Sequence, residues 1–442
     1  MSDYMFMLES HLSSEQNHVV ALMEAAAGQA GVQAFLAGGA MRDMLGGFPI
    51  RDLDFTIEGG ASKLLKLLQN GSGARLLSSD ETRKSTELLF PNGVFAEVRS
   101  AHVAHYTRPA AKPQIEPSSI QEDLRRRDFT INSIALSLSR GSRGLLLDPT
   151  NGSSDIERRE LRANSNYSLY DDPSRILRMF RLQTRMGFSL DPRLQQQYEN
   201  VRLARLETKI PPKALLAELH RIAAEPNAVF LLETLEREKL LILFSPTLQG
   251  QKLNISTFSK LEKARQSIPF GVDFRADDFG LFCYLLAEKF TPKERTAFAQ
   301  HLGMSKEETE SWQKLEDRAR KLETTLKSSR LNRASLVFRA LRDEPGELIL
   351  FLLLRSGQRL VTDRIKNYLL KCLPAACEVR DRDLAHLNLD PASPQFRQAR
   401  DELIFAVLDG RVRKPEPAGE GEASAVSAVA ASTPERRSRS IQ

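Results

Sequence analysis

The sequence lacks the features that mark membrane and secreted proteins. Its longest apolar run, residues 348–354, has seven residues, whereas a membrane-spanning helix needs about 20. The first ten residues include Asp3 and Glu9 and show no basic start followed by an apolar stretch. We therefore expect neither a secretory signal nor a membrane segment.

Cysteine and histidine are also scarce. The three cysteines, Cys283, Cys372 and Cys377, cannot all pair and have no zinc-site spacing. The seven histidines form no HExxH pattern, so a histidine-based metal hydrolase has no support. These features favour a cytoplasmic protein with reduced, buried thiols.

The composition is that of an ordinary globular protein. Hydrophobic residues make up 41% and charged residues 27% of the 442 positions, which excludes collagen-like, coiled-coil-only and wholly disordered chains. At roughly 150 residues per domain, the length allows about three domains. The net charge of +6 is small for this length, so only its location along the chain is informative.

The hydrophobic pattern changes along the chain. Strand patterns at 34–37, 53–57 and 145–147, a hairpin pattern at 88–90 and 94–98, and a helical pattern at 62–70 predict a mixed sheet covered by helices. Beyond Asp172, long helical patterns continue to about Leu408. The predicted fold class is α+β: an N-terminal head with a mixed β-sheet, followed by all-α domains. The segment from Pro415, which ends in basic residues 436–439, is expected to be disordered.

The chemically richest strand pattern carries Asp52 and Asp54. Side chains at i and i+2 share one face of a strand, about 6.5–7 Å apart, so Leu53, Phe55 and Ile57 would face the core. Two adjacent carboxylates repel each other, and a cation between them would relieve this. Mg²⁺ suits such a site because it binds carboxylates together with substrate phosphates. A DxD alone is weak evidence, since residues 381–383 contain another.

A glycine pair precedes these carboxylates, at the junction of a strand and a probable helix. Gly38 and Gly39 would let backbone N–H groups approach a phosphate closely, and Arg42 could add a charge-assisted contact. The alternative is a tight turn in which Arg42 pairs with Asp43. Glu97 is the candidate third carboxylate, and its alternative is an ordinary exposed strand glutamate.

Together these residues resemble the class II tRNA nucleotidyltransferases (CCA-adding enzymes) and the bacterial poly(A) polymerases. Residues 35–57, FLAGGAMRDMLGGFPIRDLDFTI, resemble the first motif of the family, and DLRRRDFTINSIA at 123–135 resembles the second. DPTNG at 148–152 and DDPSRILRMFRLQTRMGF at 171–188 resemble the two motifs that follow. The resemblance is strong over about 30–240 and weaker over 382–412.

The resemblance implies roles for individual residues. Asp52 and Asp54 would hold two Mg²⁺ ions, and Glu97 would help to activate the 3′-hydroxyl of the RNA primer. The nucleotide would be bound by Gly38, Gly39, Arg42, Arg127, Asp128, Asn132, Asp172, Arg175 and Arg178. Among these, Asp172 and Arg175 match the base-reading motif, and a carboxylate and a guanidinium do offer an acceptor and donors to a base edge. The alternative for Asp172 is helix capping before Pro173.

The implied activity is template-independent addition of CCA, or of its CC or A part, to tRNA 3′ ends from CTP and ATP, with release of pyrophosphate. Ile210-Pro211-Pro212 replaces the Ser-x-Glu-Arg common in CCA-adding enzymes, and this favours the alternative of a poly(A) polymerase. A third alternative is an inactive RNA-binding protein. A further departure is Asp171 in place of Glu, which keeps the charge. His102 in place of Arg and Ala104 in place of Glu predict that a salt bridge of the family is missing.

The domain prediction combines the pattern and the resemblance: a nucleotidyltransferase head at 1–160, a helical neck that binds nucleotide and RNA at 161–240, a helical RNA-binding body and tail at 241–412, and a disordered tail at 413–442.

Residues 171–213 hold nine Lys and Arg against five Asp and Glu. Within them Arg175, Arg178, Arg181 and Arg185 recur at helical spacing. We expect some of these arginines to order the nucleotide pocket and others to contact the RNA backbone. The alternative is a solvated basic face, and the sequence does not define an oligomeric state.

Overall fold

The computed structural model describes residues 3–80, 84–269, 271–272, 274–276, 278–391 and 393–412. The segment 413–442, for which the sequence predicts disorder and a basic end, lies outside the described residues. The chain divides into two compact units, one formed by residues up to 258 with 282–309, the other by 259–281 with the residues from 310 onward. Each unit is described by itself.

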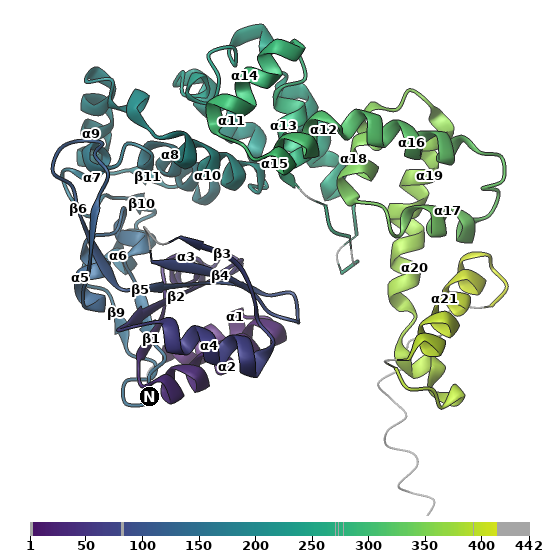
Figure 1. Cartoon of the computed structure of the whole chain (residues 1–442), viewed down its shortest axis with the longest axis horizontal. Coiled ribbons are helices and arrows are strands. Elements are labelled where there is room, and N and C mark those ends of the chain that lie inside the picture. The colour runs from purple at the N-terminus through teal and green to yellow at the C-terminus, as the bar shows by residue number, and fades with distance from the viewer. Residues whose placement is uncertain are drawn as a thin grey trace, which may run out of the picture. The chain divides into compact units, whose positions relative to one another are not determined.

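A seven-stranded mixed sheet forms the centre of the first unit (Figure 1). The strands lie in the order β3-β4-β5-β2-β1-β8-β9, and β2 and β5 run parallel while the other neighbours are antiparallel. Their bounds are Gln33–Ala37 (β1), Leu53–Glu58 (β2), Arg75–Asp80 (β3), Ser85–Leu89 (β4), Phe95–Ser100 (β5), Ala135–Ser137 (β8) and Leu146–Leu147 (β9). Two separate ribbons pair His102–His105 (β6) with Gln114–Pro117 (β7), and Glu160–Leu161 (β10) with Ser189–Leu190 (β11).

Alternating side chains fix the orientation of the central strand. Leu53, Phe55 and Ile57 of β2 are fully buried, as the period of two requires for a strand with one face against the core. On β5, Ala96 and Val98 are buried on the corresponding face. The opposite face of both strands is thereby free to carry Asp54 and Glu97.

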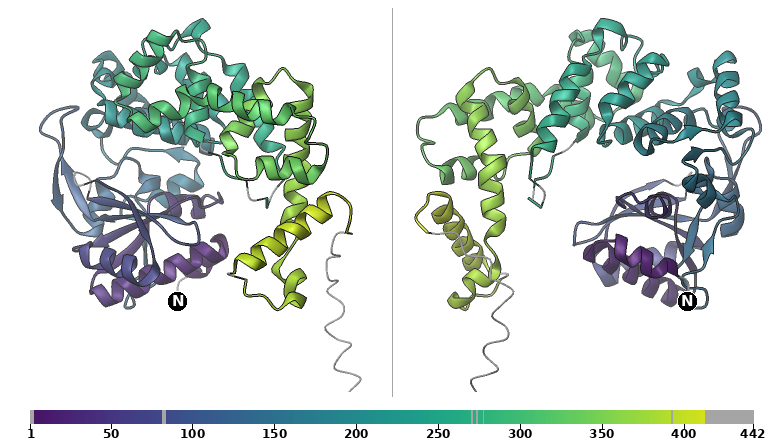
Figure 2. Two further views of the ribbon diagram at one scale, coloured as in Figure 1. Left: turned by 45° about the vertical axis from the view of Figure 1, so that its right-hand side comes forward. Right: turned by 180° about the vertical axis from the view of Figure 1, so that it is seen from behind.

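The helices of the first unit begin with α1 and α2, and α2 lies beside α4 against the sheet (Figures 1 and 2). The α-helices are Asp3–His11 (α1), Ser14–Ala30 (α2), Gly39–Leu45 (α3), Ser62–Ser72 (α4), Ile120–Arg125 (α5), Gly152–Glu157 (α6), Ser168–Asp171 (α7), Arg175–Met186 (α8), Pro192–Leu203 (α9), Pro212–Ala223 (α10), Ala228–Arg237 (α11) and Pro292–Leu302 (α14). Short 3₁₀ helices are Thr130–Asn132 (η1), Leu206–Lys209 (η2), Leu241–Leu243 (η3) and Gly250–Lys252 (η4).

The second unit is helical throughout its described residues. Its helices are Leu315–Lys327 (α16), Ala334–Leu341 (α17), Gly346–Arg355 (α18), Arg359–Asn367 (α19), the π-helical turn Tyr368–Cys372 (η5), Leu373–Glu378 (α20), Asp381–Leu387 (η6) and Pro394–Leu408 (α21). The chain passes between the two units within three further helices, which are Ile255–Gln266 (α12), Asp278–Leu286 (α13) and Lys306–Gln313 (α15).

The structure confirms the predicted fold class, a mixed-sheet head followed by helices. Strands β1, β2 and β9, helix α4 and the β4–β5 hairpin lie where the sequence pattern predicts them, and the helical pattern ends at Leu408 as expected. No helix within the described residues has the length and apolarity to cross a membrane.

Candidate active site

Asp54 and Glu97 lie side by side on the face of the sheet opposite Leu53, Phe55 and Ile57. They are register partners on the parallel strands β2 and β5. Asp52 lies just before the first residue of β2. The structure therefore brings together the carboxylates that the sequence predicts to act together.

The surroundings of Asp54 disfavour its negative charge. Burial, followed by the charges of Glu97 and Asp52, raises the pKa of Asp54 to about 6, and burial also raises the pKa of Asp52. A cation would relieve this repulsion, so the donor set suits a metal that binds carboxylates. Within the described residues, no group of three or more His, Cys, Asp or Glu side chains is arranged to hold a metal ion. A metal here would thus rest on few protein ligands, as Mg²⁺ does when phosphates complete its coordination.

The glycine pair packs directly against this carboxylate. Gly38 has φ +67°, a conformation that side chains other than glycine rarely adopt. A Cβ on Gly38 would lie 3.2 Å from Arg127 Nη1, and a Cβ on Gly39 would lie 3.1 Å from Asp54 Oδ2. The Gly39 N–H donates a hydrogen bond to Asp54 Oδ2 at 3.2 Å. The two glycines thus permit the approach of backbone, carboxylate and guanidinium that the sequence attributes to phosphate binding.

Arg127 is held by a buried network. Its Nε and Nη2 donate to Asp123 Oδ2 at 2.9 and 2.8 Å, and Nη2 also donates to Thr56 Oγ1 at 2.9 Å. Asp123 is 1% exposed and pairs with Arg99 at 2.6 Å. Although burial opposes its charge, the two arginines lower the pKa of Asp123 well below its usual range. Asp123 therefore fixes the guanidinium of Arg127 beside Gly38.

A second chain of polar contacts joins four more of the predicted residues. Arg178 Nη1 donates to Asp128 Oδ2 at 2.6 Å, and Asn132 Nδ2 donates to Asp128 Oδ1 at 3.1 Å. Asn132 Oδ1 in turn accepts from Arg42 Nη1 at 2.7 Å. Arg178 and Arg175 lower the pKa of the buried Asp128 below its usual range. Asp128, Asn132 and Arg178 therefore form one hydrogen-bonded cluster, to which Arg42 is joined from inside the protein.

The alternative predicted for Arg42 is also observed. Arg42 is 6% exposed and pairs with Asp43 at 2.8 Å. Asp43 also binds Arg185 of α8, at 2.6 Å. Arg42 thus links the glycine turn to α8 and offers little surface to a ligand.

The arginine side chains that recur along α8 are largely neutralised by acidic residues elsewhere in the chain. Arg181 is buried between Glu218 and Glu225, both at 3.3 Å. Arg185 pairs with Asp43 and its side chain is 12% exposed. The sequence predicts that some of these arginines contact the RNA backbone, and Arg181 is not available for that role because its guanidinium faces carboxylates inside the protein.

Asp172 and Arg175 lie at the start of α8. Asp172 Oδ1 accepts from Ser174 N at 3.0 Å, so the capping alternative is observed. Arg175 Nη1 donates to Ser168 Oγ at 2.8 Å, and Ser168 Oγ donates to the carbonyl of Asp128 at 3.1 Å. These contacts place Arg175 next to the Asp128 loop.

The departures from the family pattern have local explanations. The backbone N–H of His102 donates to Asp123 at 3.3 Å, and its Nδ1 lies 2.9 Å from the carbonyl of Ser100. Arg99 supplies the salt bridge to Asp123 here, so this carboxylate does not need a cation at position 102. Pro212 begins α10, where its fixed φ suits the first helical turn. Nothing in the structure explains Ala104.

The DPTNG segment has a structural role. Asp148 accepts hydrogen bonds from Gly152 N at 2.7 Å and from Ser153 N at 2.9 Å. A Cβ on Gly152 would lie 2.1 Å from the carbonyl oxygen of Thr130. Only glycine therefore lets α6 pack onto η1, which carries Asn132.

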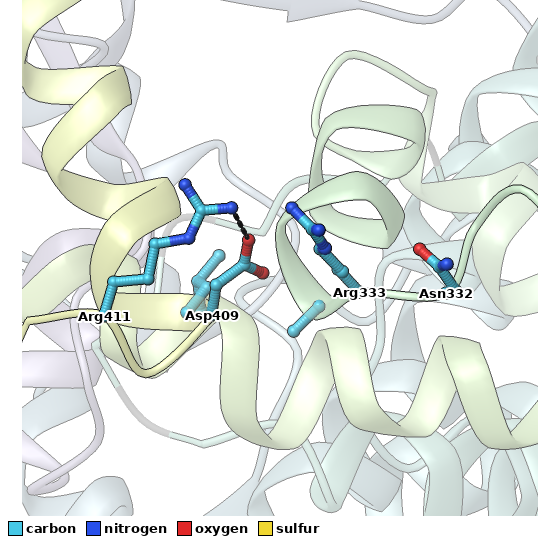
Figure 3. Close-up of a pocket in the computed structure, with 6 residues that line it drawn as sticks. Asn332, Arg333, Asp409 and Arg411 are labelled. Carbon is cyan, nitrogen blue, oxygen red and sulfur yellow. Dashed lines mark ion pairs between the residues drawn. The ribbon is translucent and has the colours of Figure 1, made fainter.

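The C-terminal segment of weaker resemblance contains a residue, Asp409, that caps the start of helix α17. Asp409 accepts from Ser335 N at 3.1 Å and from Ser335 Oγ at 2.8 Å, at the start of α17. Figure 3 shows Asp409 paired with Arg411, at 3.5 Å, beside Arg333 and Asn332. These residues line a pocket of about 380 Å³ in the second unit. The cap joins α17 to the end of α21.

Sequence reasoning missed several residues of the site: Asp123, Arg99, Thr56, Glu218 and Ser168. One of them had a usable signal, because Asp123 precedes Arg127 by four residues on a helix, the spacing of an ion pair. The others join the site through contacts between elements far apart in the chain. No local pattern identifies them.

Comparison with known proteins agrees with this geometry. Residues 34–162 match the family described as poly A polymerase head domain. An A-adding tRNA nucleotidyltransferase of Aquifex aeolicus is 28% identical over 344 residues, 77% of this chain and 40% of that protein. A CC-adding tRNA nucleotidyltransferase of Deinococcus radiodurans is 36% identical over 192 residues, 43% of this chain and 50% of that protein. The chain thus spans half or less of the length of these relatives.

Solved structures share the fold over most of the chain. A CCA-adding enzyme in its apo form II has a TM-score of 0.54 at 22% identity, with 92% of this chain and 95% of that chain covered. A tRNA-processing enzyme in its apo form I has a TM-score of 0.52 at 23% identity, with 90% and 99% covered. With the acidic pair, the glycine turn and the Arg127–Asp128 loop in place, residues 34–162 resemble the poly A polymerase head domain, and the chain is similar to A-adding and CC-adding tRNA nucleotidyltransferases.

Proposed function

We propose that this protein is an RNA nucleotidyltransferase that adds CCA, or its CC or A part, to tRNA 3′ ends from CTP and ATP without a template. The observation that carries the proposal is the juxtaposition at Asp54. One carboxylate there contacts the Gly38–Gly39 turn, faces Glu97 and lies near Arg127. A nucleotidyltransferase needs this combination, because it must hold a triphosphate and neutralise charge on it at the same place.

The metal site of the proposal consists of Asp52 and Asp54, and we propose Mg²⁺ as the metal. The fit is supported by the chemistry of the donors: Asp54 is a register partner of Glu97, and burial together with the charges of Glu97 and Asp52 raises its pKa, which a bound cation would reverse. When bound, Mg²⁺ would lower the pKa of the RNA 3′-hydroxyl and stabilise the charge of the departing pyrophosphate.

The chain's own residues would position the reacting groups. The Gly38–Gly39 turn and Arg127 would bind the triphosphate, and Asp128, Asn132 and Arg178 would hold the ribose. The 3′-oxygen of the RNA forms a bond to the α-phosphorus, and the bond between this phosphorus and the bridging oxygen breaks. Glu97, opposite Asp54, would accept the proton of the hydroxyl. Rate acceleration would come from positioning and charge neutralisation.

The base would be read at the start of α8. Asp172 offers a carboxylate, and Arg175 is oriented by Ser168 next to the Asp128 loop. Both roles of Asp172 are compatible, since one oxygen caps the helix while the other lies 3.9 Å from Arg175. We propose that the head and neck predicted at 1–160 and 161–240 share this nucleotide site, and that the helices of 241–412 contact RNA.

A poly(A) polymerase is the second candidate. Ile210-Pro211-Pro212, at the start of α10, favours it over a CCA-adding enzyme, and the matching family is described by this activity. The named relatives, which add A or CC to tRNA, favour the first candidate.

One experiment separates these candidates. The purified protein is offered tRNA lacking CCA, tRNA ending in C-C, and unstructured RNA, each with CTP and ATP separately. Addition limited to C, C and A, or to a single A, supports the tRNA enzyme. Long A tracts on unstructured RNA support the polymerase. RNA binding without any incorporation would overturn both proposals in favour of an inactive RNA-binding protein.

A further inference from the structure

A cavity of about 480 Å³ lies on the first unit, formed by segments outside the acidic pair and the glycine turn. Its walls come from η1, the 150–166 segment and the start of α9. The polar and charged side chains of the wall include Thr150, Arg162, Asn164, Asp191 and Arg193. This volume falls within the range of ligand sites, about 300–1,000 Å³.

Three residues of the cavity wall carry a buried polar atom without a hydrogen-bond partner in the described part of the chain. These atoms are Arg162 Nε and two oxygens, Thr150 Oγ1 and Asn164 Oδ1. An unsatisfied buried polar atom costs about 1–3 kcal/mol, and a ligand that reaches it would recover this cost. Both oxygens accept hydrogen bonds, and the Thr150 hydroxyl can also donate one. The two oxygens suit hydroxyl groups of a ligand.

The cavity wall carries two arginines, and carboxylates of the protein engage one of them. Arg162 is shared by Asp155, Glu160 and Asp191 at 3.5, 2.7 and 3.7 Å, so it brings no surplus positive charge. Arg193 is exposed and has no side-chain partner among the described residues. A phosphodiester carries one negative charge, whereas a triphosphate carries several.

The cavity is tied to the nucleotide loop through Asn164. Its Nδ2 donates to the carbonyls of Leu124 and Arg127, both at 3.1 Å, and to Ser133 Oγ at 2.6 Å. The backbone N–H of Asn164 donates to the carbonyl of Asp128 at 3.2 Å. A ligand that binds Asn164 Oδ1 is thus one side chain away from the loop that carries Arg127 and Asp128.

We propose that this cavity binds one ribose-phosphate unit of the RNA substrate, upstream of the 3′ end that reacts. Asn164 Oδ1 accepts from the 2′-hydroxyl, the Thr150 hydroxyl donates to the oxygen of the same group, and Arg193 contacts the phosphate. The residues that line the cavity include no aromatic ring, so a free nucleotide would find no surface on which to stack its base. The repeating sugar and phosphate of a strand need no such surface, and the 2′-hydroxyl distinguishes RNA from DNA. The inference rests on the proposed function, because it assumes that the substrate is RNA.

The test compares Thr150→Val and Arg193→Ala with a matched control, Arg140→Ala, in the full-length protein. Arg140 is an exposed arginine of the same unit without a side-chain partner among the described residues, and it does not line the cavity. The Kd for a fluorescein-labelled RNA minihelix ending in C-C is measured by anisotropy. We expect Kd to rise about tenfold for Arg193→Ala and about threefold for Thr150→Val, with no change for the control. The KM for ATP should stay within about twofold in every variant.

A second arm locates the sugar contact. A series of minihelices carries one 2′-deoxy position each, moved stepwise from the 3′ end. The wild-type protein should lose affinity at one position, and Thr150→Val should lose no further affinity there. Because the hydroxyl of Thr150 lacks a partner, Thr150→Val should also leave the thermal midpoint unchanged or raise it, which excludes misfolding as the cause.

Two outcomes would overturn the inference. Unchanged RNA affinity in Thr150→Val and Arg193→Ala would show that the cavity does not bind the strand. A raised KM for ATP with unchanged RNA affinity would assign the cavity to a free nucleotide instead. In either case, incorporation by the wild-type protein in the same assay shows that the proposed function itself still holds.

Discussion

At the scale of single residues, Asp54 has the least favourable electrostatic surroundings of the candidate metal ligands. Its pKa of about 6 means that protons and a metal compete for the same carboxylate. Above pH 6 the carboxylate is ionised and available, and below pH 6 it is increasingly protonated. The affinity for Mg²⁺ should therefore fall as the pH is lowered from 7.5 to 5.5, by up to about tenfold per pH unit below 6. Calorimetric titration with Mg²⁺ at several pH values checks this, and a pH-independent affinity would contradict it.

The acidic pair should be needed for chemistry and dispensable for RNA binding. Asp52→Ala and Asp54→Ala should each abolish nucleotide incorporation while RNA affinity stays within about twofold, because phosphate contacts of other residues hold the RNA. Asp381→Ala, in the second DxD of the chain, is the matched control and should keep full activity. Primer extension and anisotropy are the measurements. Substantial incorporation by both head variants would disprove the metal assignment.

Gly152 supports the site without touching a substrate. An added Cβ would lie 2.1 Å from the carbonyl oxygen of Thr130, so Gly152→Ala must push α6 away from η1. We expect a loss of about 2–3 kcal/mol in the free energy of unfolding, as for other overpacked positions. In contrast, Gly28→Ala in α2 meets no atom within 4 Å and should gain about 0.5–1 kcal/mol. Urea unfolding of both variants measures the difference, and equal stability of the two would contradict this account.

At the scale of elements, α8 is held to its surroundings by ion pairs. Its apolar face is buried, including Ile176, Leu177 and Phe180, while its arginines reach Asp43 on α3, Asp128 before η1, and Glu218 on α10. A buried charge without its partner is costly. The carboxylates therefore determine where the helix, and with it Arg175 and Arg178, can lie.

Glu218 gives this element a pH dependence. Arg181, Arg178 and Arg221 outweigh the effect of burial and lower the pKa of Glu218 to about 2. Because the folded-state pKa lies below the ordinary value of 4.5, the stabilisation is present above pH 4.5 and is lost as the pH falls toward 2. Glu218→Gln should lose about 3 kcal/mol at pH 7 and show a flatter stability profile between pH 4.5 and 2. Urea unfolding across this range tests it, and parallel profiles for the two proteins would disprove it.

At the scale of the whole molecule, the charge excess is distributed differently from what the sequence suggests. The basic segment 171–213 suggests an RNA-facing helix, but Arg178, Arg181 and Arg185 find partners that lie far away in the chain. Arg185 pairs with Asp43 at a separation of 142 residues and Arg178 with Asp128 at 50. Local charge counting does not include such partners.

This distribution predicts the salt dependence of RNA binding. Each phosphate contact that is lost lowers the slope of log Kd against log salt concentration by about one. Because Arg185 is neutralised inside the protein, Arg185→Gln should lower the thermal stability and leave this slope unchanged. Anisotropy titrations at several salt concentrations measure the slope. A slope reduced by about one would instead show that Arg185 contacts RNA.

The sequence predicts the regular parts of the molecule and the identity of many site residues, but not their contacts. Strand period and turn residues locate β1, β2 and the β4–β5 hairpin because these signals are local. The two-residue strands β10 and β11 carry no such signal, and their pairing depends on the packing of segments about 29 residues apart. The partners of Arg127 and Arg178 likewise depend on tertiary packing. Spacing therefore predicts which side chains belong to the candidate site and leaves open how each one is held.

The hydrogen bond between the Gly39 amide and the Asp54 carboxylate couples the two ligands of the proposed reaction. In the proposed reaction a phosphate would bind the amide and a metal ion would bind the carboxylate, so either ligand would compete with this hydrogen bond. The cost of breaking this bond falls on whichever ligand binds first, and the second binds without it. Metal and nucleotide should therefore bind with positive cooperativity, and by thermodynamic reciprocity each must increase the affinity of the other by the same factor.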